Sequence, residues 1–175
     1  MEKILSMPFT VFHFGPGILI GLLTLKYLDF PTFVAANLVV DWRAALVFFG
    51  VWPFGGPLHS WLSTYPGAVL SGAILSVAMI HIRPHLQKSL EDIRIKQDFS
   101  NRKILVSALL GVVIHVSLDA FHHPNIQPFL IEGVKPFFGL MTTSQVRALT
   151  FACILASFPV YIAHVRGFIN LNTLA

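Results

Sequence analysis

The segment His115-Val-Ser-Leu-Asp119-Ala-Phe-His122-His123 holds four side chains that can bind a metal ion. Their spacing is i, i+4, i+7 and i+8, so on a helix they share one face. Neutral imidazole and carboxylate are ordinary ligands for zinc and similar divalent ions. We therefore expect His115 and Asp119 to bind metal, with His122 and His123 as additional ligands or substrate contacts. The alternative is a buried His–Asp pair that only joins helices.

Three further residues are candidate ligands. Asp41 lies between two apolar runs, and an ionisable residue at such a position is costly in a membrane and usually functional. His59 follows Gly-Gly-Pro-Leu in a loop, and His13 comes just before Gly15-Pro16-Gly17, which is typical of a helix start. Each histidine alone is a weak indication, because loop and interfacial histidines are common.

The composition indicates a membrane protein. The chain has 175 residues, of which 55% are hydrophobic and 11% charged, whereas a soluble domain would have about a quarter charged. Its apolar residues come in long blocks, as in membrane spans. We predict an all-α integral membrane protein with a single domain over residues 1–175, a bundle of about five transmembrane helices. The predicted spans are 14–28, 31–52, 66–82, 103–121 and 148–168.

The distribution of basic residues predicts the orientation in a cell membrane. Six of them lie within residues 83–103, which the positive-inside rule places in the cytoplasm. Alternating five spans puts Lys26 and Arg166 on the same side, against Lys3, Lys135 and Arg147 outside. The net charge of +4 comes from basic residues concentrated in one loop, which indicates membrane orientation, so we expect no nucleic-acid partner.

The same topology gathers most of the candidate ligands near the outer leaflet. His13, His59 and the end of the fourth span all fall on the outer side. Asp41 sits near the middle of the second span, so it joins them only if the pocket dips inward or that span is shorter.

Four landmarks in chain order carry a family resemblance: Thr10-Val-Phe-His13, Val39-Val-Asp41, Leu58-His59-Ser60 and His115-Val-Ser-Leu-Asp119. Over residues 7 to about 130 the chain resembles the YdjM-type membrane-bound metal-dependent hydrolases. The helical metal site of that family is similar to the site of zinc-dependent phospholipase C.

The resemblance implies one to three divalent ions, Zn²⁺ first among them. It also implies that Asp119 bridges two ions. The ligands that it implies are His13, Asp41, His59, His115 and Asp119. The chain departs from the family pattern where Trp42-Arg43 replaces an acidic run, and where Gly55-Gly-Pro-Leu58 replaces the histidine that comes shortly before the His59-Ser60 motif.

These observations predict a membrane-embedded metal-dependent hydrolase. A metal-activated water would cleave a phosphoester of a phospholipid or another lipid-linked substrate, with Asp41 or Asp119 orienting or deprotonating that water. Two alternatives stay open: a proton or divalent-cation transport element, and a non-catalytic membrane module with a structural metal. The sequence is also compatible with a homo-oligomer.

Overall fold

The computed structural model describes residues 13–42, 46, 51 and 61–171. This part of the chain is helical and contains no strand, which confirms the predicted all-α class. Its helices are α2 (Phe14–Leu23), α3 (Phe30–Val39), the short 3₁₀ helix η2 (Trp61–Ser63), α5 (Tyr65–Asp92), α6 (Asn101–His122) and α7 (Thr143–Val165).

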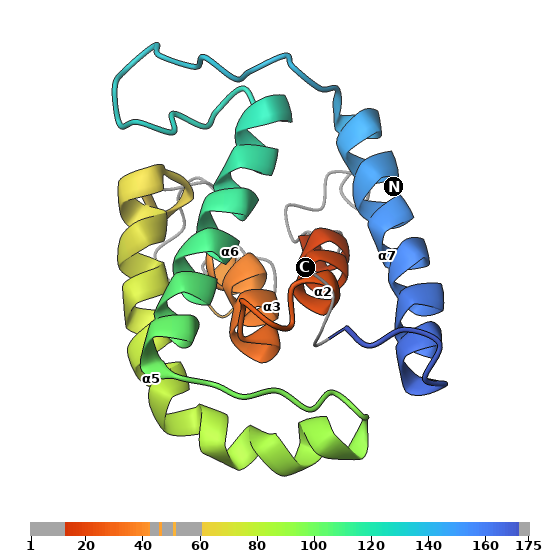
Figure 1. Cartoon of the computed structure of the whole chain (residues 1–175). Helices are drawn as coiled ribbons and strands as arrows, with labels where there is room; N and C mark the ends of the chain where they lie inside the picture. The colour runs from red at the N-terminus through yellow and green to blue at the C-terminus, as the bar shows by residue number, and fades with distance from the viewer. Residues whose placement is uncertain (1–12, 43–45, 47–50, 52–60, 172–175) are drawn as a thin grey trace.

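Three of these helices, α5, α6 and α7, are long and apolar enough to cross a membrane. They contain the predicted spans 66–82 and 103–121 and most of 148–168. Helix α5 continues well beyond Ile82, to Asp92, with Pro84 inside it. The ribbon changes direction in this stretch, as expected where a proline removes a backbone hydrogen bond (Figure 1).

The first two predicted spans are not confirmed. Helices α2 and α3 have 10 residues each, about 15 Å, against a hydrocarbon core of about 30 Å. Helix α2 ends at Leu23, and the chain turns before Asp29 begins α3 by accepting a hydrogen bond from the Thr32 amide at 3.3 Å. The capping aspartate lies between the predicted spans 14–28 and 31–52, so the break is where the sequence placed it, while the helices on either side are shorter than predicted. Much of residues 43–60 lies outside the described part of the chain.

The two short helices lie between α6 and α7 (Figure 1). Helix α3 packs against α6 and α5, and α2 packs against α7 and α3. The contact between α3 and α6 is close because Gly111 has no side chain: a Cβ there would lie 2.5 Å from the Cβ of Ala36. This close packing brings the C-terminal end of α3 to the half of α6 that contains His115.

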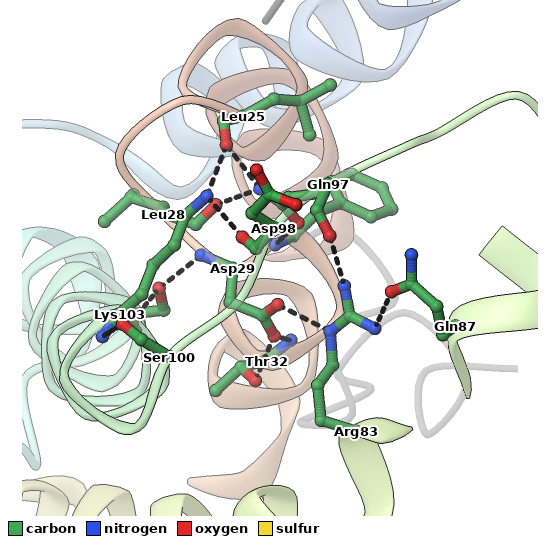
Figure 2. A network of polar contacts seen from close by, with 12 residues as sticks. Leu25, Leu28, Asp29, Thr32, Arg83, Gln87, Gln97, Asp98, Ser100 and Lys103 are labelled. Atoms are coloured by element: carbon green, nitrogen blue, oxygen red, sulfur yellow. Dashed lines mark hydrogen bonds and ion pairs between the residues drawn. The ribbon is translucent and has the colours of Figure 1, made fainter. Parts of the chain in front are cut away.

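A buried polar network ties the α2–α3 turn to α5 at the other end of α6 (Figure 2). Arg83 and Asp29, both fully buried, form an ion pair with 2.6 Å between Nε and Oδ1. The Gln97 side chain donates to the carbonyl oxygens of Leu25 and Leu28. Lys103 also donates to the Leu25 carbonyl, at 2.8 Å. These bonds satisfy carbonyls of the turn between α2 and α3 and fix that turn against α6 and the segment before it.

Candidate metal centre

His115 is held in one orientation by a backbone carbonyl. Its Nδ1 atom lies 2.7 Å from the carbonyl oxygen of Asn37, near the end of α3. A carbonyl can only accept, so Nδ1 carries the proton and Nε2 presents its lone pair. This arrangement, in which a backbone acceptor fixes the imidazole, is the usual outer support of a metal-binding histidine.

Two further side chains lie close to this site: Asp119, also on α6, and His13, which directly precedes α2. The His115 Nε2 atom lies 3.3 Å from Oδ2 of Asp119, one helical turn later. The other carboxylate oxygen of Asp119 lies 3.3 Å from Nε2 of His13, which directly precedes α2. The side chains of these residues are 0–1% exposed, so solvent does not satisfy them.

These close approaches do not form hydrogen bonds. Both ring nitrogens of His13, Nε2 of His115 and Oδ1 of Asp119 are buried without a hydrogen-bond partner. Leaving buried polar atoms unsatisfied costs roughly 1–3 kcal/mol each, and an isolated buried carboxylate costs more. A cation among them removes most of this cost, since Nε2 of His13, Nε2 of His115 and Oδ1 of Asp119 can each donate an electron pair to it, while the other His13 nitrogen carries the ring proton.

The spacing of the atoms fits such an ion. Two ligand atoms that each lie about 2.0–2.1 Å from a tetrahedral zinc ion are separated by roughly 3.3–3.4 Å. Both His–Asp119 distances in the group are 3.3 Å. The group His13, His115 and Asp119 could therefore hold a metal ion, as the sequence predicted for these three residues.

Asp41 approaches the group on the His115 side, with its Oδ1 atom 3.3 Å from His115 Nε2. It reaches this position because α3 ends at Val39, which leaves Asp41 just beyond the helix. The sequence analysis placed Asp41 at the site only if the pocket dipped inward or the second span was shorter, and the helix is indeed shorter than the predicted span 31–52. His59, the fifth predicted ligand, lies outside the described residues.

His122 and His123 form a second group with Asp119, and the ligand atoms of all three lie within 4.8 Å of one another. The Nδ1 atom of His122 faces the Leu118 carbonyl at 2.9 Å, and the imidazole rings of His122 and His123 lie with their centroids 4.0 Å apart and their planes tilted by 40°. His123 Nε2 lies 3.9 Å from the Asp119 oxygen that faces His13. Unlike the first group, this one reaches the surface, since the His123 side chain is 29% exposed.

Sequence reasoning did not identify Asn37 or the Asp29–Arg83 pair. Asn37 supports His115 through its main-chain carbonyl, and no residue type reveals such a role. The one signal in the sequence was an asparagine within an apolar segment, which the structure buries. Arg83 was assigned to the basic loop, but it lies within α5 and is fully buried. Its partner Asp29 is distant in sequence, so only the fold reveals the pairing.

The segment that follows the second group exposes many apolar side chains. Residues 123–142 connect α6 to α7 across one end of the molecule (Figure 1). The segment returns to the site end of α6, where the Gly139 amide donates to the Phe121 carbonyl at 3.0 Å. Its exposed apolar residues are Phe129, Leu130, Ile131, Val134, Phe138 and Leu140.

Compared with known family models, with curated proteins and with solved structures, the chain matches none of them.

Proposed function

We propose that this chain is a membrane-embedded, zinc-type hydrolase that cleaves a phosphoester of a phospholipid or of another lipid-linked substrate. The observation that carries the proposal is the convergence of buried His13, His115 and Asp119 atoms at 3.3 Å without hydrogen bonds. The resemblance of these residues and Asp41 to the YdjM-type hydrolases gives the same reaction class.

A divalent ion in this group would lower the pKa of water to about 7 and polarise the phosphoryl group. With three protein ligands, a fourth position is available to water or substrate, as in catalytic zinc sites. Asp41 lies beside His115 and is not needed as one of these three ligands. We assign it the role of general base: its carboxylate accepts a proton from water as the water oxygen bonds to phosphorus. The P–O bond to the leaving alcohol then breaks, and Asp41 returns the proton to that oxygen.

The surroundings of the site favour a substrate that arrives through lipid. Three helices are apolar enough to span a membrane, and the connecting segment 123–142 exposes apolar side chains next to the site end of α6. The basic residues 94–103 lie near the opposite end of α6. By the positive-inside rule we place that end in the cytoplasm and the metal group near the outer leaflet of the cell membrane.

A second ion is part of the proposal. Asp119 belongs to both groups of ligands, so it would help to hold an enclosed ion with His13 and His115 and a more accessible one with His122 and His123. The separation of 3.9 Å between His123 and Asp119 exceeds the tetrahedral value by roughly half an ångström. The partly exposed His123 side chain can move by that amount. An accessible ion is suited to binding the substrate phosphate.

The proposal is tested with detergent-purified protein loaded with Zn²⁺ and supplied with mixed micelles of different phospholipids. Release of diacylglycerol, phosphate or head-group phosphate is measured beside the His115→Ala/Asp119→Ala variant. We expect release by the wild type and none by the variant. A folded, zinc-loaded wild type that hydrolyses no lipid class would refute the assignment.

The enclosure of the first group favours a second candidate, a structural metal that joins α2 to α6. His13 and His115 are fully buried, as ligands of structural sites are. The two candidates differ in the His115→Ala variant. A structural ion predicts loss of folding, seen as a large fall in the thermal unfolding midpoint, whereas a catalytic ion predicts loss of activity in a protein that still folds.

A further inference from the structure

A small pocket lies where η2 meets the segment that follows α6. Its volume is about 240 Å³, and its lining includes Trp61 and Ser63 on one side and Asn125 and Gln127 on the other. Drug-sized ligands occupy roughly 300–1,000 Å³, so this pocket suits a smaller group.

The pocket offers hydrogen-bonding groups that the protein itself does not use. Ser63 is 95% buried, since its exposed fraction is 5%, yet its hydroxyl bonds to no other residue of the described chain. The side-chain amides of Asn125 and Gln127 likewise have no bond to described residues. By contrast, the neighbouring Thr64 hydroxyl is occupied, because it caps α5 and bonds to the Trp61 carbonyl. Because Ser63 is part of the pocket lining and its hydroxyl is not used by the described protein, this hydroxyl is available to a ligand.

The chemistry of the lining indicates an uncharged, hydroxyl-rich ligand. The described lining has no charged side chain; its polar groups are hydroxyls and amides, which both donate and accept hydrogen bonds. Trp61 is 54% exposed and adds a flat apolar face against which the C–H face of a sugar or cyclitol ring can pack. A choline or ethanolamine group would find no carboxylate among the described lining residues.

The pocket is close to the more accessible histidine group. Asn125 follows His123 by two residues, so their Cα atoms are at most about 7 Å apart. The Ile126 amide also bonds back to the His123 carbonyl at 3.4 Å, which holds this wall against the end of α6. A head group in the pocket would thus place an attached phosphate toward His122 and His123.

We propose that this pocket binds the neutral polyol head group, such as glycerol, inositol or a single sugar, of the lipid phosphoester that the metal centre cleaves. The proposal rests on the proposed function for its biological meaning, but binding in the pocket is measurable without hydrolysis.

The test is saturation-transfer difference NMR on the detergent-solubilised full chain, with myo-inositol, glucose and choline as separate probes. We expect signals from the two polyols and none from choline. In the Ser63→Ala/Gln127→Ala variant the polyol signal should fall at least fivefold, while a control variant at the other end of the molecule, Ser89→Ala/Asn101→Ala, should retain it.

Metal content, measured on the same samples, reports whether the fold is kept. If the double variant loses its metal, the single variant Trp61→Leu decides, because this half-exposed side chain can be removed without opening the core; it too should lose the polyol signal. Preference for choline, or polyol signals that no variant changes, would overturn the proposal. Metal binding and lipid hydrolysis without polyol binding would reject the pocket alone, and polyol binding without hydrolysis would reject the proposed function alone.

Discussion

The Nε2 atom of His115 and the Oδ2 atom of Asp119 lie 3.3 Å apart within one turn of α6, both enclosed by protein. A histidine and an aspartate at this separation would ordinarily form a hydrogen bond. Here the His115 proton is on the other ring nitrogen, which faces the Asn37 carbonyl, and Nε2 has no hydrogen-bond partner. With this tautomer the pair can present two electron-pair donors to a common point, as the ligands of a metal ion do.

The first prediction concerns metal content. Elemental analysis of the purified wild type should detect at least one zinc-like ion per chain, and the His115→Ala/Asp119→Ala variant should have lost it. His81→Ala is the matched control, because His81, like His115, is a helix histidine whose Nδ1 faces a backbone carbonyl, in its case that of Val77 in the same helix. A wild type that contains no metal and cannot be reloaded would contradict the assignment.

The Asp41→Asn variant separates base from ligand. Because Asp41 is assigned to proton transfer and not to holding the first ion, the variant should keep that ion and lose about 10²–10⁴-fold in kcat for lipid hydrolysis. Steady-state kinetics and metal analysis on the same preparation check this. The exposed Asp92→Asn substitution should leave both quantities unchanged. Loss of the ion in Asp41→Asn would instead make Asp41 a ligand.

The two histidines after Asp119 should control a second ion. Under saturating Zn²⁺ the wild type should bind two ions, His122→Ala/His123→Ala one, and Asp119→Ala neither, because the Asp119 carboxylate belongs to both groups. Equilibrium dialysis followed by elemental analysis measures the stoichiometry. One ion in both the wild type and the double-histidine variant would limit the protein to a single metal.

The Arg83–Asp29 pair should matter for stability and not for chemistry. Arg83→Ala would leave the Asp29 carboxylate buried without its partner, which is expected to lower the free energy of unfolding by roughly 3–5 kcal/mol. Denaturant titration in detergent measures the change. The double variant Asp29→Ala/Arg83→Met should recover part of the loss, and the exposed Arg102→Ala should have little effect. Equal effects of Arg83→Ala and Arg102→Ala would show that the pair is not structural.

The long helices were predictable because their signal is local. Each of α5, α6 and α7 holds an apolar run of membrane length, and a run of this kind favours a helix whatever surrounds it. For the two short helices the sequence placed the break, between the predicted spans 14–28 and 31–52, but not the lengths of the helices, which end at Leu23 and Val39. Nor did it give the bonds at the break, where Asp29 caps α3 and pairs with Arg83 from α5. An aspartate between two apolar runs does not reveal, in the sequence, which distant cation will neutralise it.

For the site, the sequence by itself determined the pair within α6, since a spacing of four residues on a helix places His115 and Asp119 on one face wherever that helix packs. It also identified His13 and Asp41 as candidates by residue type. Only the tertiary structure decided that these two reach the pair. The approach of Asp41 depends on the close contact of α3 with α6 at Gly111 and on the end of α3 at Val39, and that of His13 on the packing of α2 against α3. Packing between elements sets both features, and no spacing along the chain encodes it.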